Sequence, residues 1–126
     1  MTTEQIANRM VTLLRNGEYA TIYQELFSPD VISAEPEGTP WGSVKGLDEL
    51  AKKGVEFNKL VEAFHSVEIS EPLCADHFIA LSMKSMVTWK GAPGPTNMDE
   101  LCVYTVEDGK IVKEEFFYKP MPNSIA

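Results

Sequence analysis

Glu35, which closes a short apolar run and precedes Pro36, is one of the carboxylates in this sequence that could act as a general base. A carboxylate that faces an apolar pocket has its pKa raised by desolvation, which suits proton abstraction near neutral pH. A strand-end carboxylate can also bond to the backbone of the turn that a proline introduces. The residue type leaves both roles open for Glu35.

Two further glutamates and two tyrosines in the second half of the chain are also candidates. Glu100 could lie at the mouth of a cavity or at an exposed strand end. Glu114 could share a proton with Glu35 inside a cavity, or it could be an edge-strand charge that discourages aggregation. Tyr104 and Tyr118 could donate a proton, although tyrosines of this kind are more often core residues with a satisfied hydroxyl.

The remaining candidates give no support for metal or phosphate chemistry. His65 and Glu68 are three residues apart on a predicted strand and point to opposite faces, so they cannot chelate one metal ion. Gly91 and Gly94 belong to a proline-containing hairpin loop, which is not the setting of a phosphate-binding loop. We therefore expect no metal ion and no cofactor.

Trp41, in the loop after the candidate base, could be a pocket lid or a cover for a helix.

Helical spacing of apolar residues dominates the first half of the chain. The pattern predicts a helix capped by Thr2 or Thr3 and ended by Asn16-Gly17. A second, shorter helix is expected from Glu18 to the stop at 28–30, and a third over 47–63. A short strand over 31–35 lies between the second and third helices, and it ends at the candidate base.

After residue 64 the apolar pattern alternates, which is typical of strands. We expect strands over 66–74, 78–89, 100–106 and 111–118, and Asp108-Gly109 is a strong hairpin signal. Helices followed by an antiparallel meander favour an α+β fold with helices against one face of a curved sheet. A long helix across such a sheet encloses a cone with a natural cavity.

Length and charge limit the function classes. The 126 residues suffice for one core, so we expect one domain over 1–126. Eleven Lys and Arg against nineteen Asp and Glu give a net charge of −8, which disfavours nucleic acid and anionic membranes as partners. No apolar run reaches the roughly 20 residues of a membrane span. Residues 1–16 lack a signal-peptide core and the two cysteines form no motif, so we expect a cytoplasmic protein.

Neither face of the predicted strands is cleanly polar. Over 78–89, for example, one face carries Ile79 and Leu81, and the other carries Phe78 and Met86. The outer face of the sheet therefore needs a cover, and a second copy of the chain supplies one most simply. We expect a homodimer through that face.

Several short segments in a fixed order resemble the SnoaL-like proteins of the nuclear transport factor 2-like superfamily. They are Gly17-Glu18-Tyr19 between the first two helices, the segment 28–36, Gly46 before the third helix, and the closing segment 103–111. The resemblance spans nearly the whole chain. It implies a cone-shaped α+β barrel, usually dimeric, with a pocket between helices and sheet, but it does not settle function.

The resemblance also bears on individual residues. Glu35 occupies the place of the general base of the ketosteroid isomerases, which lie on this fold. The places of their two oxyanion donors hold Val11 and Cys102, neither of which is a strong donor, so steroid isomerase activity is not expected. Polyketide cyclases of the SnoaL type use a carboxylate and a histidine, a pair that Glu35 and His65 could supply.

The strand register that the resemblance implies turns one largely apolar wall toward the cavity. The residues expected to bind a ligand there are Trp41, Met83, Val87, Trp89, Glu100, Cys102, Tyr104, Glu114, Phe116 and Tyr118. One hypothesis is an enzyme in which Glu35 abstracts a proton next to the carbonyl of an apolar small molecule, with His65 or a tyrosine as donor. The alternative is a non-catalytic homodimeric module that binds a small ligand or a partner protein.

Overall fold

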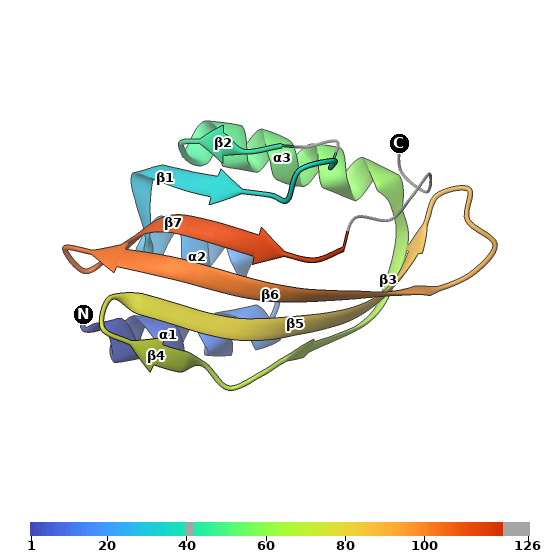
Figure 1. The fold of residues 1–126 in the computed structure, drawn as a ribbon. Coiled ribbons are helices and arrows are strands. Elements are labelled where there is room, and N and C mark those ends of the chain that lie inside the picture. Colours follow the sequence, from blue (N-terminus) through green and yellow to red (C-terminus); the bar gives the residue numbers. More distant parts are fainter. Residues whose placement is uncertain (40–41, 120–126) are drawn as a thin grey trace.

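One curved sheet forms the centre of the described residues, with helices α1 and α2 behind it in the view of Figure 1. The computed structural model describes residues 1–39 and 42–119, so Trp41 lies outside the described residues. The helices are α1 (Thr3–Arg15), α2 (Tyr19–Glu25) and α3 (Leu47–Leu60). The strands are β1 (Phe27–Ala34), β2 (Val44–Lys45), β3 (Val61–Ile69), β4 (Leu73–Ala75), β5 (Phe78–Trp89), β6 (Thr96–Glu107) and β7 (Lys110–Phe117). The predicted α+β class is confirmed.

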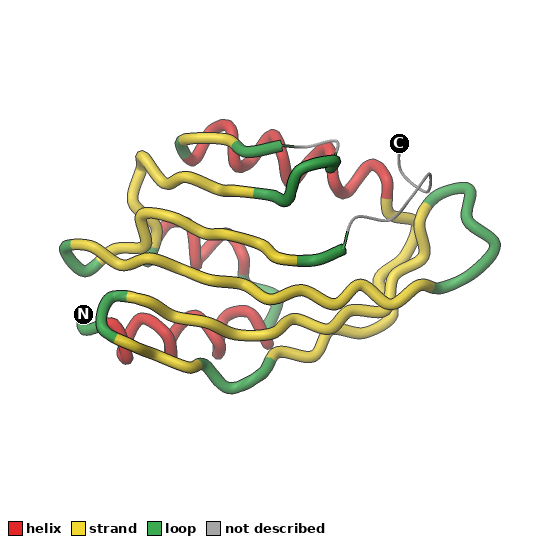
Figure 2. The backbone as a smooth tube through the Cα atoms, in the orientation of Figure 1, coloured by secondary structure: helices red, strands yellow, loops and turns green. Residues whose placement is uncertain are grey.

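The strand order places β1 between the short edge strand β2 and β7. The order is β2-β1-β7-β6-β5-β3, with β4 paired to β5. Strands β5, β6 and β7 form the expected antiparallel meander, whereas β1 runs parallel to β7 with Ser33 opposite Glu114. Figure 2 shows the long strands curving together around the helices. The sheet therefore has a concave side, which the helices cover.

Helix α1 shows how local sequence sets an element's ends. The Thr2 hydroxyl accepts a hydrogen bond from the Gln5 N–H, and the Gln5 side chain accepts one from the Thr2 N–H. At the other end Gly17 adopts a φ of 71°, and the N–H groups of Gly17 and Glu18 donate to the carbonyls of Leu14 and Leu13. None of the helices in the described part of the chain is long and apolar enough to cross a membrane.

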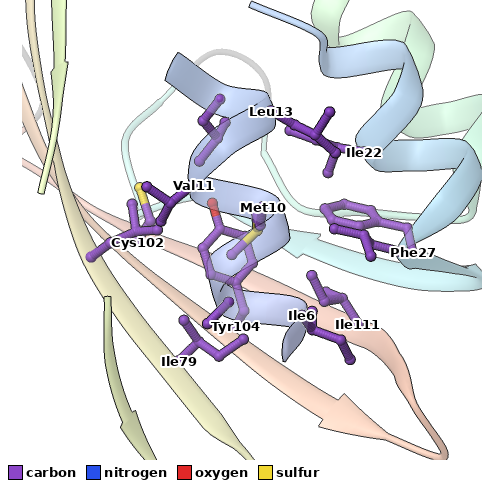
Figure 3. Packing of buried hydrophobic residues seen from close by; sticks show 14 of the residues in the cluster. Ile6, Met10, Val11, Leu13, Ile22, Phe27, Ile79, Cys102, Tyr104 and Ile111 are labelled. Carbon is purple, nitrogen blue, oxygen red and sulfur yellow. The ribbon is translucent and has the colours of Figure 1, made fainter. Parts of the chain in front are cut away.

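The core lies between α1 and the sheet. Figure 3 shows Ile6 and Met10 of α1 facing Ile79, Tyr104 and Ile111 of three neighbouring strands. All five side chains are at most 3% exposed. Burial of this apolar face holds α1 across one end of the cone, and a hollow remains elsewhere between helices and sheet.

The structure corrects several predicted boundaries. Helix α3 ends at Leu60 and not at residue 63, because Val61 already has extended backbone and pairs with Trp89. The predicted strand over 66–74 is two strands, β3 and β4, separated near Pro72, which has no N–H for the ladder. Strand β6 begins at Thr96, four residues earlier than expected, since its hairpin loop with β5 is shorter.

Candidate active site

A cavity of about 900 Å³ lies between the helices and the concave side of the sheet. Most of its wall is apolar, and aromatic rings such as those of Tyr23, Phe27 and Phe57 contribute to it. Its ionisable and hydroxyl-bearing side chains include Glu35, Lys53, Ser85, Glu100, Tyr104, Glu114 and Tyr118. A largely apolar hollow with a few convergent polar groups is the usual form of a small-molecule site.

Glu35 lies on the wall of this cavity directly after β1, and its side chain is only 6% exposed. One carboxylate oxygen accepts a hydrogen bond of 2.7 Å from the Tyr118 hydroxyl. The other lies 3.0 Å from the Nζ of Lys53. The carboxylate is therefore held by side chains from opposite sides of the cone, and the alternative role at the proline turn is not what fixes it.

Lys53 is a functional residue that the sequence analysis missed. It projects from α3, its side chain is 10% exposed, and it donates hydrogen bonds to Glu35 and to the Ser33 hydroxyl. Its ammonium group also lies 5.3 Å from the centre of the Phe116 ring. The signal was present in the helical spacing, because Lys53 follows Leu50 by three residues on the apolar stripe of α3.

Glu114 continues this polar chain on β7. Its carboxyl group accepts a 2.7 Å hydrogen bond from Ser33, and the residue is 4% exposed. Burial raises the pKa of Glu114 to about 7, and the negative charge of Glu35 adds to the rise, whereas the bond from Ser33 and the charge of Lys53 oppose it. Tyr118, Glu35, Lys53, Ser33 and Glu114 thus form one connected network.

Glu100 faces the same cavity from β6. Burial raises the pKa of Glu100 to about 7, and repulsion from Glu35 and Glu114 raises it further, while Lys53 acts in the opposite direction. At Glu100, burial and repulsion from Glu35 and Glu114 outweigh the attraction of Lys53, and at Glu114 burial outweighs the bond from Ser33 and the charge of Lys53. At neutral pH the site therefore carries carboxyl groups in both protonation states.

Tyr104 and Cys102 lie deeper along the same strand. Burial raises the pKa of the Tyr104 hydroxyl well above its usual value, and it raises that of the Cys102 thiol in the same way. Both groups keep their protons at physiological pH, and the thiol is not a nucleophile.

Most of the residues expected on the cavity wall do line it. These are Glu35, Met83, Trp89, Glu100, Tyr104, Glu114, Phe116 and Tyr118. Val87 and Cys102 share the inward face of their strands but are 0% exposed and lie outside the lining, so for them the expectation is corrected. Neighbouring side chains cover both, and Figure 3 shows Cys102 in the core together with Val11.

His65 does not face the cavity. A bulge in β3 between Phe64 and Ser66 inserts an extra residue, so that Phe64 and Val67 face inward. His65 turns to the other side of the sheet, where its Nε2 lies 2.7 Å from the Thr88 hydroxyl. The expected pairing of His65 with Glu35 is corrected for this reason.

No metal centre accompanies these groups in residues 1–39 and 42–119. Within those ranges, no three His, Cys, Asp or Glu side chains are grouped so that they could hold a metal ion. The carboxyl groups of the cavity are instead arranged around Lys53 and Ser33. The arrangement can bind a small molecule, hold a proton or move one.

Comparison with known proteins shows which family matches this chain and which solved structures are similar to it. The SnoaL-like domain family matches residues 1–118. A candidate SnoaL-like polyketide cyclase of Mesorhizobium loti is 30% identical, with a TM-score of 0.86 over 94% of this chain and 100% of that one. No curated protein matches the chain.

Two more distant structures share the fold. TerC, crystallised with polyporic acid, is 16% identical, with a TM-score of 0.75 over 94% of this chain and 92% of that one. A Catenulispora acidiphila protein with a ketosteroid isomerase-like fold, in complex with trimethylamine, is 17% identical. Its TM-score is 0.72 over 98% of this chain and 91% of that one. These likenesses support the cone-shaped fold that the sequence predicted.

Proposed function

This chain belongs to the SnoaL-like domain family, and we propose that it is an enzyme that abstracts a proton next to the carbonyl group of a small, largely apolar molecule. Glu35 is the base in this proposal. The observation that carries it is a carboxylate that is 6% exposed on the wall of a cavity of about 900 Å³. A cavity of that size holds a molecule of one to a few rings.

The contacts of Glu35 are compatible with this role. Tyr118 and Lys53 occupy one lone pair on each carboxylate oxygen, and a carboxylate offers about four such sites. The remaining sites can accept a proton from a bound molecule. Because both partners are themselves held in place, the carboxylate is oriented before a substrate arrives, which lowers the entropic cost of the reaction.

The relatives support a small molecule as the partner. The Mesorhizobium loti relative is described as a candidate polyketide cyclase, and two neighbours of the same fold hold polyporic acid and trimethylamine. A carbonyl compound with one or two rings would contact the aromatic wall through Tyr23 and Phe57 and present its oxygen to the polar network. We propose a ligand of this class, a carbonyl compound with one or two rings, for the present chain.

Hydrogen–deuterium exchange tests the proposal without knowledge of the natural substrate. We would incubate the protein with 1-tetralone, a bicyclic ketone, in D₂O and follow loss of the proton signal next to the carbonyl by NMR. Glu35→Gln should slow the exchange by at least about 100-fold. Glu37→Gln, an exposed neighbour, is the control and should exchange like the original protein. Equal rates for Glu35→Gln and the original protein, with both folded, would remove Glu35 as the base.

The ion pair between Glu35 and Lys53 favours a second candidate, a module that binds a ligand without converting it. Lys53, 3.0 Å from the carboxylate, already balances its charge within the protein. Val11 and Cys102, at the places of the isomerase donors, are buried and supply no strong hydrogen bond. Calorimetric binding of 1-tetralone without any deuterium exchange would favour this candidate over the enzyme.

We also propose that the protein is a homodimer through the outer face of the sheet. Leu101 of β6 and Phe117 of β7 are directly paired on that face and are 47% and 50% exposed. Phe78 of β5, on the same face, is 50% exposed. Leu101→Lys should produce monomers in sedimentation equilibrium, whereas the apolar control Leu101→Met should not. A monomeric original protein would contradict the proposal.

The cytoplasm is the compartment that we propose for this protein. Cys74 and Cys102 are both free thiols, as is usual where the redox environment keeps cysteines reduced. The net charge of −8 supports a small molecule over nucleic acid or an anionic membrane as the partner. Filter binding to DNA and flotation with anionic vesicles should both give no association.

A further inference from the structure

We infer that Glu100 is the acid of this site and donates a proton to the carbonyl oxygen of the bound molecule while Glu35 removes the neighbouring carbon-bound proton. This inference rests on the proposed function and deepens it. Proton abstraction next to a carbonyl builds negative charge on oxygen, so the site needs a donor there as well as a base. The donor has to be a group whose hydrogen is not already used within the protein.

The hydrogens of Tyr118 and Ser33 and two of the three hydrogens of Lys53 are already engaged, and the Lys53 ammonium group also lies 5.3 Å from the centre of the Phe116 ring. The Tyr118 hydroxyl donates to Glu35, and Lys53 donates to Glu35 and Ser33. The Ser33 hydroxyl donates to Glu114. Diverting any of these hydrogens to a ligand would break an existing bond around a buried charge, which is costly.

Tyr104 is unsuitable for a different reason. It is only 3% exposed and packs in the hydrophobic core together with Cys102. Glu100 lies on the same inward face of β6, two residues before Cys102 and opposite Met83 of β5. It is partly exposed and lines the cavity, and within the described residues it has no hydrogen bond or ion pair. A ligand oxygen can therefore reach it.

Burial and nearby negative charges explain why Glu100 keeps its proton. Desolvation is the main cause of its raised pKa, about 7, and the charges of Glu35 on the β1 side and Glu114 on β7 add to it. Lys53 of α3 is the opposing cation, but it is already bonded to Glu35. The remaining titratable groups that line the cavity in the described part of the chain are Asp99, Lys119 and the hydroxyls of Tyr19, Tyr23, Tyr104 and Tyr118. Glu114 has a similar pKa, but it is 4% exposed and bonded to Ser33.

The step balances without any further reactant. Glu35 takes the proton from carbon, and the electron pair of that C–H bond forms the new C=C bond. The carbonyl π electrons move to oxygen, which takes the proton of Glu100 as its O–H bond breaks. The product is an enol, with Glu35 protonated and Glu100 ionised. Return of the protons, to the same or another carbon, restores both side chains.

Carbonyl ¹³C NMR tests this role separately from turnover. The probe is 1-tetralone labelled with ¹³C at the carbonyl carbon, because a hydrogen bond to the oxygen moves this resonance downfield. With the original protein, the bound resonance should be downfield at about pH 5.5 and should move upfield with a midpoint near 7. Glu100→Leu should abolish both the downfield shift and its pH dependence. Glu100→Gln, which keeps an N–H donor, should retain part of the shift without the pH dependence.

The rates of deuterium exchange give the second readout. Exchange by the original protein should decline above about pH 7 as Glu100 ionises, and Glu100→Gln should slow it by about 10- to 100-fold and remove that decline. Glu107→Gln, at the exposed end of the same strand, is the matched control and should behave like the original protein. An unchanged carbonyl shift and pH profile in both Glu100 variants would overturn the inference. If the original protein shows the carbonyl shift but no deuterium exchange, this result would instead overturn Glu35 as the base.

Discussion

Replacing Lys53 by methionine should destabilise the fold by about 3 kcal/mol at pH 8, because it leaves the Glu35 carboxylate buried without its counter-ion. Methionine preserves most of the side-chain volume and the helix propensity of α3, so that charge is the main change. The neighbouring Lys52 offers a matched comparison. Lys52 also lies 3.0 Å from a carboxylate, that of Glu49.

The two lysines differ in their surroundings and not in their geometry. The side chains of Lys53 and Glu35 are 10% and 6% exposed, whereas those of Lys52 and Glu49 are 72% and 52% exposed. Water screens the second pair, and such a pair contributes about 0.5 kcal/mol or less. Breaking a buried pair costs about 3–5 kcal/mol, and we take the lower end because Tyr118 still donates to Glu35.

Thermal and urea unfolding of the two variants measure this difference. In a domain of this size about 3 kcal/mol corresponds to a loss of about 10 °C in Tm for Lys53→Met, against about 2 °C or less for Lys52→Met. The double variant Lys53→Met/Glu35→Gln should recover much of the stability, because it leaves no unpaired charge. Equal losses for the two single variants would refute the reasoning from burial.

Further predictions concern the buried carboxyl group of Glu114 and the glycines Gly54 and Gly17. Folding raises the pKa of Glu114 to about 7, so the folded state binds more protons than the unfolded chain between about pH 4.5 and 7. The contribution of Glu114 to the free energy of unfolding should therefore fall by about 2 kcal/mol from pH 5 to 8, and Glu114→Gln should remove this part of the decline in urea titrations. Gly54→Ala should raise Tm, with a gain of about 0.5–1 kcal/mol, because Gly54 is inside α3 and nothing lies within 4 Å of the added Cβ. Gly17→Ala should lower it by about 1 kcal/mol, since its φ is +71°.

Local signals in the sequence were sufficient for much of the fold. The apolar spacing and caps of α1 set its start at Thr2 and its end at Gly17, because both depend on hydrogen bonds between near neighbours. The alternation over 78–89 predicted the bounds and inward face of β5 correctly. Asp108-Gly109 marked the hairpin between β6 and β7, where both residues have positive φ.

The boundaries and faces that failed depend on pairing between distant strands. His65 was assigned to the cavity face by counting alternate residues, and the bulge next to Phe64 breaks that count. A bulge is chosen by the fit between β3 and β5, which local alternation does not encode. Val87 and Cys102 were assigned to the correct face but not to the cavity, because neighbouring side chains decide which inward residues stay uncovered.

The sequence by itself determined that Glu35 lies at the end of a strand segment, directly after the last strand residue Ala34, in an α+β fold, and that several carboxyl groups could reach one cavity. Only the tertiary structure decided how they are held. It brings Lys53 to Glu35 across 18 positions of the chain and Ser33 to Glu114 across 81. Electrostatic energies depend on distance and burial in space, and neither can be read from positions along the chain. For this reason the bonds of Lys53 to Glu35 and Ser33 could be identified only from the packing of α3 against the sheet, although helical spacing alone already placed Lys53 on the inward side of α3.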